Sequence, residues 1–225
     1  MKSINAKIAA GAVGAALLCG TANADDRFTG TAHDWSGHFI GIQGGGAWGD
    51  SESVGSASTG TYGIDGGFIG WTSGANWQNG AWVWGYESDT SFGDISGEVG
   101  GCAPANCYAQ VNWFSTIRGR IGYATGMFLF YGTAGLAYGE VQSGVLGTGS
   151  LGESDDISAG LAIGAGVEMA FDQNWSAKIE YLHIDLGDNV SPGVPTAVTT
   201  DFDDIHLVRV GLKRKFDLWG LITNR

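Results

Sequence analysis

The sequence predicts an all-β fold: an eight-stranded antiparallel up-and-down transmembrane β-barrel with short turns at one end and four long loops at the other. The first observation behind this prediction is that charged residues alternate with bulky apolar residues. In the segment AWVWGYESDTSF, Glu87 and Asp89 alternate with Trp82, Trp84 and Tyr86. Residues i and i+2 of a strand share a face. One face of this segment is therefore charged and the other is aromatic.

Two further segments repeat the pattern. Arg118 and Arg120 lie in WFSTIRGRIGY, and Lys178 and Glu180 lie in NWSAKIEYL. A strand of a soluble sandwich turns its apolar face inward and its charges to water. Here the large residues occupy one face, and charges and glycines occupy the other. This pattern is typical of a barrel with a lipid-facing exterior and a polar interior.

The second observation is a secretory signal over residues 1–24. Lys2 and Lys7 form its basic region, residues 8–18 its short apolar core, and Ala22-Asn23-Ala24 a small-residue cleavage site. The apolar core is too short to span a bilayer as a helix. The predicted organisation is a cleaved signal peptide (1–24), an N-terminal lead (25–35), a β-barrel (36–216) and a C-terminal tail (217–225).

The third observation is that short and long connections alternate. Eight segments show period-two alternation: 36–48, 66–77, 81–92, 112–124, 127–139, 157–171, 175–186 and 204–216. Tight turns are predicted at Asn79-Gly80, Ala124-Thr125-Gly126 and Asp172-Gln173-Asn174, and long loops at 49–65, 93–111, 140–156 and 187–203. Bacterial outer-membrane barrels have short periplasmic turns and long outer loops, so the tight turns should face the periplasm.

The alternation of faces predicts a group of charged residues inside the barrel. Its members are four acids and five bases: Glu87, Asp89, Arg118, Arg120, Glu168, Lys178, Glu180, Arg209 and Lys213. Neighbouring strands carry opposite signs, and a buried charge is costly unless it is paired. An eight-stranded barrel is just wide enough for side chains to fill it. We therefore predict a salt-bridged plug with a structural role, and no wide pore.

Two cysteines remain after removal of the signal. Cys102 and Cys107 flank Ala-Pro-Ala-Asn in a predicted loop. In an exported protein such a pair predicts a disulfide. A metal site would need further ligands nearby, so we predict no metal and no cofactor. The formal net charge is −12, and the predicted long loops carry acids without lysine or arginine. Phosphate binding needs clustered basic residues, so nucleic acid is not an expected partner.

Several blocks together resemble one family. They are WSGHFIGIQGGGAWG (35–49), GGFIGWTSGANWQNGAWVWGYESD (66–89), NWFSTIRGRIGYA (112–124), FLFYGTAGLAYG (128–139), GAGVEMAFDQNWSAKIEYLHIDLG (164–187) and VRVGLKRKF (208–216). They are similar to the small outer-membrane β-barrel proteins of alphaproteobacteria, often labelled outer-membrane immunogenic or porin-family proteins. The resemblance implies a location in the bacterial outer membrane and a structural, antigenic or host-contact role.

The same resemblance implies partners. These are outer-membrane lipid and lipopolysaccharide, the barrel-assembly machinery, and host surfaces or other envelope proteins. Family members usually end at the aromatic that corresponds to Phe216, whereas this chain continues to Arg225. Arg214 stands at an outward position where the family usually has an aromatic residue.

Histidines supply the candidate chemistry. His183 and His206 should lie on neighbouring strands near the outer rim and on the same face, close to Asp185 and Asp204. They are weak candidates for hemin binding, and the ordinary alternative is that they hydrogen-bond to head groups or loops. We expect His33 to be mobile in the N-terminal lead.

The function that we favour is a non-enzymatic outer-membrane β-barrel protein with a structural, envelope and surface-interaction role. The alternatives are a narrow porin or a hemin-binding transport protein, since some family members are described in these ways. A hydrolase at the rim is supported only by the histidines with their neighbouring aspartates. The sequence has no serine motif or HExxH to support it.

Overall fold

A computed structural model describes residues 33–54, 58–99, 107–145, 153–185, 188–191 and 198–216 of the chain. None of these residues belongs to a helix that is long and apolar enough to cross a membrane. The described residues form strands joined by tight turns. The strands are β1 (Gly37–Val54), β2 (Ser58–Asn79), β3 (Trp82–Val99), β4 (Cys107–Thr125), β5 (Phe128–Val145), β6 (Glu153–Ala170), β7 (Trp175–Asp185), β8 (Asp188–Ser191) and β9 (Val198–Phe216).

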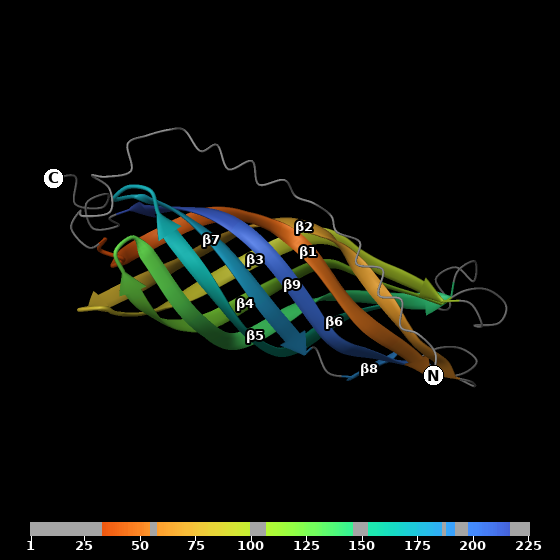
Figure 1. Cartoon of the computed structure of the whole chain (residues 1–225). Coiled ribbons are helices and arrows are strands. Elements are labelled where there is room, and N and C mark those ends of the chain that lie inside the picture. Colours follow the sequence, from red (N-terminus) through yellow and green to blue (C-terminus); the bar gives the residue numbers. More distant parts are fainter. Residues whose placement is uncertain are drawn as a thin grey trace, which may run out of the picture. The chain divides into compact units, whose positions relative to one another are not determined.

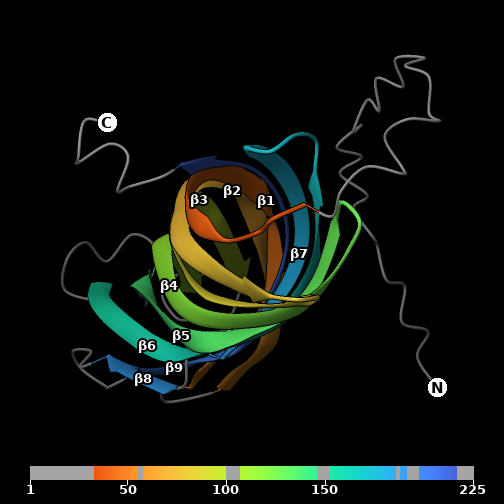
Figure 2. The same ribbon diagram turned by 90° about the vertical axis from the view of Figure 1, so that its left-hand side faces the viewer.

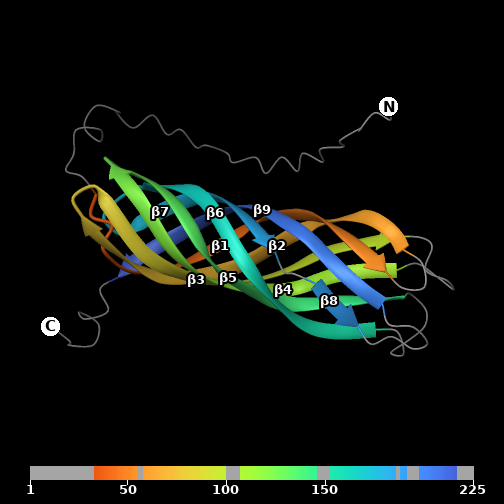
Figure 3. The same ribbon diagram turned by 90° about the horizontal axis from the view of Figure 1, so that it is seen from below.

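The strands close into the predicted antiparallel barrel. Each long strand pairs with the next in sequence, β7 pairs with β9, and β9 closes the ring by pairing with β1 (Figures 1 and 2). The closing register joins His38 to Phe216. The predicted eight-stranded barrel is thus confirmed. The short β8 adds to β9 beyond the end of β7, at the end of the barrel opposite the tight turns (Figure 3).

Tight turns gather at one end of the barrel, which we call the tight-turn end. Gly80 and Gly126 adopt φ of 60° and 57°, a left-handed conformation that glycine enters without steric cost. In the third turn, the Asp172 carboxylate accepts hydrogen bonds from the backbone N–H groups of Asn174 and Trp175. These bonds favour the charged form and lower the pKa of Asp172.

The strands are much longer than expected, and the predicted long loops were largely wrong. Residues 49–54 and 58–65 belong to β1 and β2, and similar extensions lengthen β3 to β6 and β9. A tilted strand needs only about 9–11 residues to cross a bilayer. The glycine-, serine- and aspartate-rich composition suggested loops, but paired strands also accommodate these residues. The barrel wall therefore continues beyond the span of a membrane.

The polarity of the two faces changes along the strands. In the central part the exterior is apolar, with Ile69 73% exposed. Near the opposite end Ile64, Ile95 and Val111 point inward and are buried, whereas Asp65 and Asp94 are exposed on the outside. Gln110 Nε2 donates to Asp94 Oδ1 at 3.2 Å across that outer face. The extension thus has the apolar interior and polar exterior of a soluble barrel.

A β-bulge in β4 marks this change. The register of β4 with β5 shifts between Val111 and Trp113, so Asn112 has no partner on β5. Because of the extra residue, Phe114 and Val111 are three positions apart and yet both are buried. Rings pair on the outer surface at this level, Trp71 with Phe92 at 5.4 Å and Trp113 with Tyr138 at 6.1 Å between centroids. Such aromatic girdles mark the edge of the lipid band.

Two adjacent glycines show how tightly the wall is packed on its inner side. A Cβ on Gly66 would overlap the carbonyl oxygen of Asp94, whereas a Cβ on Gly67 would find its nearest neighbour, the Gly45 oxygen, at 3.7 Å. Gly66 faces the interior, and Gly67 is exposed on the exterior. Only the first glycine is required by the close approach of β2 and β3.

We therefore expect Gly66→Ala to lower the stability of the barrel and Gly67→Ala to leave it nearly unchanged. The first substitution forces the strands apart, at about 1–3 kcal/mol for an overpacked site. Urea unfolding in lipid vesicles measures the difference. Equal midpoints for the two variants would show that inward crowding does not limit this wall.

Candidate functional site

Nine charged side chains occupy the middle of the barrel interior. They are the predicted residues Glu87, Asp89, Arg118, Arg120, Glu168, Lys178, Glu180, Arg209 and Lys213, and all of them are buried. They come from β3, β4, β6, β7 and β9. Each is brought inside by the alternation of its strand. The structure joins all nine in one ion-pair network.

Glu87 is the hub of this network. Its carboxylate lies 3.0 Å from Lys213 Nζ, 3.2 Å from Arg120 and 3.5 Å from Arg118. It also forms an ion pair with Lys178, and Arg209 approaches to 4.0 Å. One acid therefore contacts all five buried bases. A buried charge costs several kcal/mol when left unpaired. The position of Glu87 therefore constrains where each strand that carries a buried base can lie.

A second group of contacts surrounds Asp89 and Glu180. Arg118 reaches Asp89 at 2.8 Å and Glu180 at 3.0 Å. Arg209 donates from NH1 to Asp89 at 3.0 Å and from Nε to Glu180 at 2.6 Å. Arg118 Nε also donates to Thr116 Oγ1 at 2.8 Å. Each guanidinium group thus contacts one carboxylate on the neighbouring strand and one on a strand across the lumen.

The network has one more base than acid, and aromatic rings lie beside the bases near the tight-turn end. Lys213 Nζ is 3.9 Å from the centroid of the Phe39 ring, and the Arg120 guanidinium carbon is 4.0 Å from that of Tyr131. These two bases share the Glu168 carboxylate at 2.9 Å each. A cation over the face of an aromatic ring gains electrostatic stabilisation, most of all when it is desolvated. The rings therefore offset part of the cost of the surplus positive charge.

Two apolar clusters enclose the charged layer. The cluster towards the long extensions contains Ala47, Ile64, Phe68, Ile95, Val111, Phe114, Ala137, Ala162, Leu182, Ile184, Ile205 and Leu207. The cluster near the tight turns contains Trp35, Val83, Leu129, Tyr131 and Ala170. The interior is therefore filled by side chains at three successive levels. Neither apolar cluster was predicted from the sequence. The one available signal was the alternation in β7, which places Ile184 on the inward face between the outward residues His183 and Asp185.

The segment that precedes β1 belongs to the apolar cluster near the tight turns. Trp35 is 3% exposed, and its backbone N–H donates to Gln78 Oε1 at 2.7 Å. The expectation that His33 is mobile was wrong: its ring is buried and packs edge-on against Trp35 at 4.6 Å. Burial disfavours the imidazolium and lowers the pKa of His33, and the nearby Lys215 adds to this effect. This segment closes the tight-turn end of the barrel.

The two rim histidines come together on the outer wall. His183 and His206 are register partners, and their ring centroids are 5.1 Å apart. His183 Nε2 lies 3.3 Å from Asp204 Oδ1, and His206 Nδ1 lies 2.8 Å from the Tyr181 hydroxyl. Both rings project from the same face of adjacent strands. They cannot bind one haem iron from opposite sides without rearrangement.

The predicted disulfide lies outside the described residues. Cys102 falls in an undescribed stretch, and of Cys107 only the backbone is described, where it pairs with Val99 and Val145. The disulfide therefore stays a prediction. Across the part of the chain that the structure describes, no three His, Cys, Asp or Glu side chains are arranged to hold a metal ion.

The unequal charge count predicts an asymmetry between two substitutions. Glu87→Gln removes the hub and raises the buried surplus from one positive charge to two, whereas Lys213→Gln removes the surplus. We expect Glu87→Gln to cost about 3–5 kcal/mol and Lys213→Gln clearly less. Urea unfolding in vesicles measures both. Equal losses would contradict the view that a surplus of buried positive charge destabilises the network.

Comparisons with known proteins agree with this architecture. A family model described as "Outer membrane protein beta-barrel domain" matches residues 10–216. The 31 kDa outer-membrane immunogenic protein of Brucella melitensis is 35% identical over 243 residues, which cover 96% of this chain and 98% of the relative. The 22 kDa outer membrane protein of Rhizobium leguminosarum bv. viciae is 34% identical over 154 residues, covering 68% and 65%.

A solved structure shares the fold at low identity. The outer membrane protein OprG from Pseudomonas aeruginosa is 19% identical, has a TM-score of 0.55, and is matched over 82% of this chain and 98% of its own. The two sequence relatives are named as outer-membrane proteins and not as enzymes. With its lipid-facing exterior and closed ring of strands, the chain belongs to the outer membrane β-barrel protein family and resides in the bacterial outer membrane.

Proposed function

We propose that the protein is a non-enzymatic, non-conducting barrel that stabilises the envelope and presents a surface for contact with host molecules or other envelope proteins. The observation that carries this proposal is the filled interior. A charged layer lies between two apolar clusters, and Trp35 closes the periplasmic end. A hydrated path would have to break buried ion pairs that are costly to separate.

The extensions of the barrel wall support the surface role. Their outer face carries exposed Asp94 and Glu98, and Trp113 Nε1 donates to Glu140 at 2.7 Å where the aromatic girdle ends. Paired strands hold this polar face in a defined shape beyond the membrane. The Brucella relative is named an immunogenic protein, which is in keeping with a surface that antibodies can reach. Lipopolysaccharide would be the lipid next to this face, and the barrel-assembly machinery the partner in folding.

The alternative functions have weaker support. A narrow pore conflicts with the three filled levels of the interior. Hemin binding rests on His183 and His206, which point the same way and already contact Asp204 and Tyr181. A hydrolase needs an activated nucleophile beside its base. In the described region the hydroxyl that contacts His206 is that of Tyr181, a poor nucleophile while it is protonated.

We expect the reconstituted protein to be silent in planar bilayers. Heat-modifiable migration on gels first shows that the barrel is folded and inserted. A double variant, Trp35→Ala with Phe114→Ala, removes one large side chain from each apolar cluster. Its conductance is compared with that of the wild type, because a less filled interior should conduct more readily. Reproducible conductance steps from the wild type would overturn the proposal. Hemin titrated into the wild type would also overturn it if the Soret band shifted in a saturable way and His206→Ala removed that shift.

Cysteine labelling of intact cells tests which face is outside. Ser96, above the aromatic girdle, and Asn79, the last residue of β2 before a tight turn, are both exposed. We expect a membrane-impermeant maleimide to label Ser96→Cys and not Asn79→Cys, with the wild-type chain as background. After the outer membrane is permeabilised, both variants should react. Labelling of Asn79→Cys alone in intact cells would reverse the orientation and remove the basis of the surface role.

A further inference from the structure

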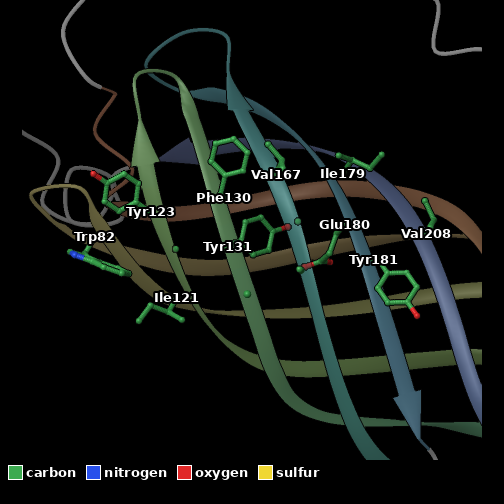
Figure 4. A pocket seen from close by; sticks show the side chains of 14 residues that line it. Trp82, Ile121, Tyr123, Phe130, Tyr131, Val167, Ile179, Glu180, Tyr181 and Val208 are labelled. Atoms are coloured by element: carbon green, nitrogen blue, oxygen red, sulfur yellow. The ribbon is translucent and has the colours of Figure 1, made fainter.

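The lipid-facing wall of the barrel is not evenly convex. A groove of about 710 Å³ crosses its outer surface over β4, β5, β6 and β7 (Figure 4). Its floor contains Gly132 and Ala165, which are register partners on β5 and β6. Larger outward residues, Ile121, Phe130 and Ile179, line its sides. Over much of the remaining belt, bulky apolar side chains are exposed.

The packing of the barrel does not require this hollow. A Cβ on Gly132 would find its nearest neighbour, the Gly164 oxygen, at 3.9 Å. By contrast, a Cβ on the inward Gly166 would lie 2.6 Å from the Tyr131 hydroxyl. A larger side chain at position 132 would therefore fit without strain and would fill the groove. The absence of a side chain leaves open space on the outer wall alone.

One end of the groove reaches the periplasmic interface. Trp82 and Tyr123, which line that end, are register partners next to the tight turn at Gly80, and their rings meet edge to face at 5.6 Å. The other end, at Tyr181 and Val208, lies farther along the strands towards the outer surface. Aromatic residues of this kind sit at head-group level. The groove thus begins at the periplasmic interface and runs into the hydrocarbon region.

A cation lies at the same interface, on the side of the groove opposite Trp82 and Tyr123. Arg214 is exposed on the outer face of β9, and its guanidinium lies 5.8 Å from the centroid of the Trp175 ring. Arg214 pairs in register with Trp175, and Val210 pairs with the groove residue Ile179. The four-residue interval from Val210 to Arg214 corresponds to about 13 Å along a strand. This separation suits a phosphate at the interface and an acyl chain in the groove.

We propose that this wall binds a glycerophospholipid of the periplasmic leaflet, with one acyl chain in the groove and its anionic phosphate at Arg214. The apolar lining matches the chain, and the guanidinium complements the phosphate. The position of Arg214 next to the tight turns favours a periplasmic-leaflet lipid over lipopolysaccharide. A second copy of the protein fits less well, because a two-fold contact would oppose one hollow to another.

Dioleoyl phosphatidylglycerol, titrated into delipidated protein in a mild detergent, provides the test. Native mass spectrometry counts the bound lipids. We expect one preferred lipid on the wild type, at least about tenfold weaker binding by Gly132→Leu, and about fivefold weaker binding by Arg214→Gln. Ser73→Leu, at an exposed outward position of β2 within the lipid band and away from the groove, is the matched control and should bind like the wild type. Heat-modifiable migration shows that each variant is folded, and Ala165→Leu replaces Gly132→Leu if the latter does not fold.

Other outcomes would overturn the proposal. Wild-type binding by the groove variant, or an equal loss in Ser73→Leu, would mean that lipid contacts are spread over the whole belt. Equally tight competition by lipopolysaccharide would contradict the assignment to the periplasmic leaflet. A dimer that Gly132→Leu dissociates would assign the groove to a second copy of the chain.

Discussion

Charge matching across the lumen is the constraint on which the rest of the barrel depends. Glu87 contacts bases on β4, β7 and β9, so strands that are far apart in sequence must close around one carboxylate. Hydrogen bonds between neighbouring strands fix the register locally. The ion pairs add a requirement across the lumen, because a slip of one residue would turn every charge of a strand to the lipid. Closure of the ring and neutralisation of its interior are therefore the same condition.

The barrel meets two solvents with a single chain. In the lipid band the wall is apolar outside and charged inside, and beyond the girdle Ile95 and Val111 are buried while Asp94 is exposed. The cost of an unpaired backbone group forbids an open edge in lipid, and the closed ring satisfies this need. The same ring then carries an ordinary apolar core in water. The apolar cluster towards the long extensions also separates the buried charges from the outer solution.

The sequence predicted the fold and the positions of the buried charges because both follow from alternation with period two. Residues two positions apart, such as Arg118 and Arg120, lie on the same face of a strand whatever its length. The strand ends were not predictable in this way, since glycine and aspartate are typical of loops and equally suit a narrow, water-exposed wall. The burial of Trp35 had no local indication, because it depends on the open mouth of the barrel. The groove at Gly132 was likewise invisible, because an outward glycine looks like any other until its neighbours are placed.

The unpaired Asn112 of the β4 bulge has a consequence for evolution as well as for folding. Below the bulge an outward position must suit lipid, and above it an outward position must suit water, so the extra residue marks the depth at which the wall of β4 leaves the lipid band. Strands can lengthen or shorten above that point without any change in the section that crosses the membrane. Changes in the water-exposed extension and changes in the membrane-spanning section are thereby separated along the length of each strand, and selection can act on one without disturbing the other.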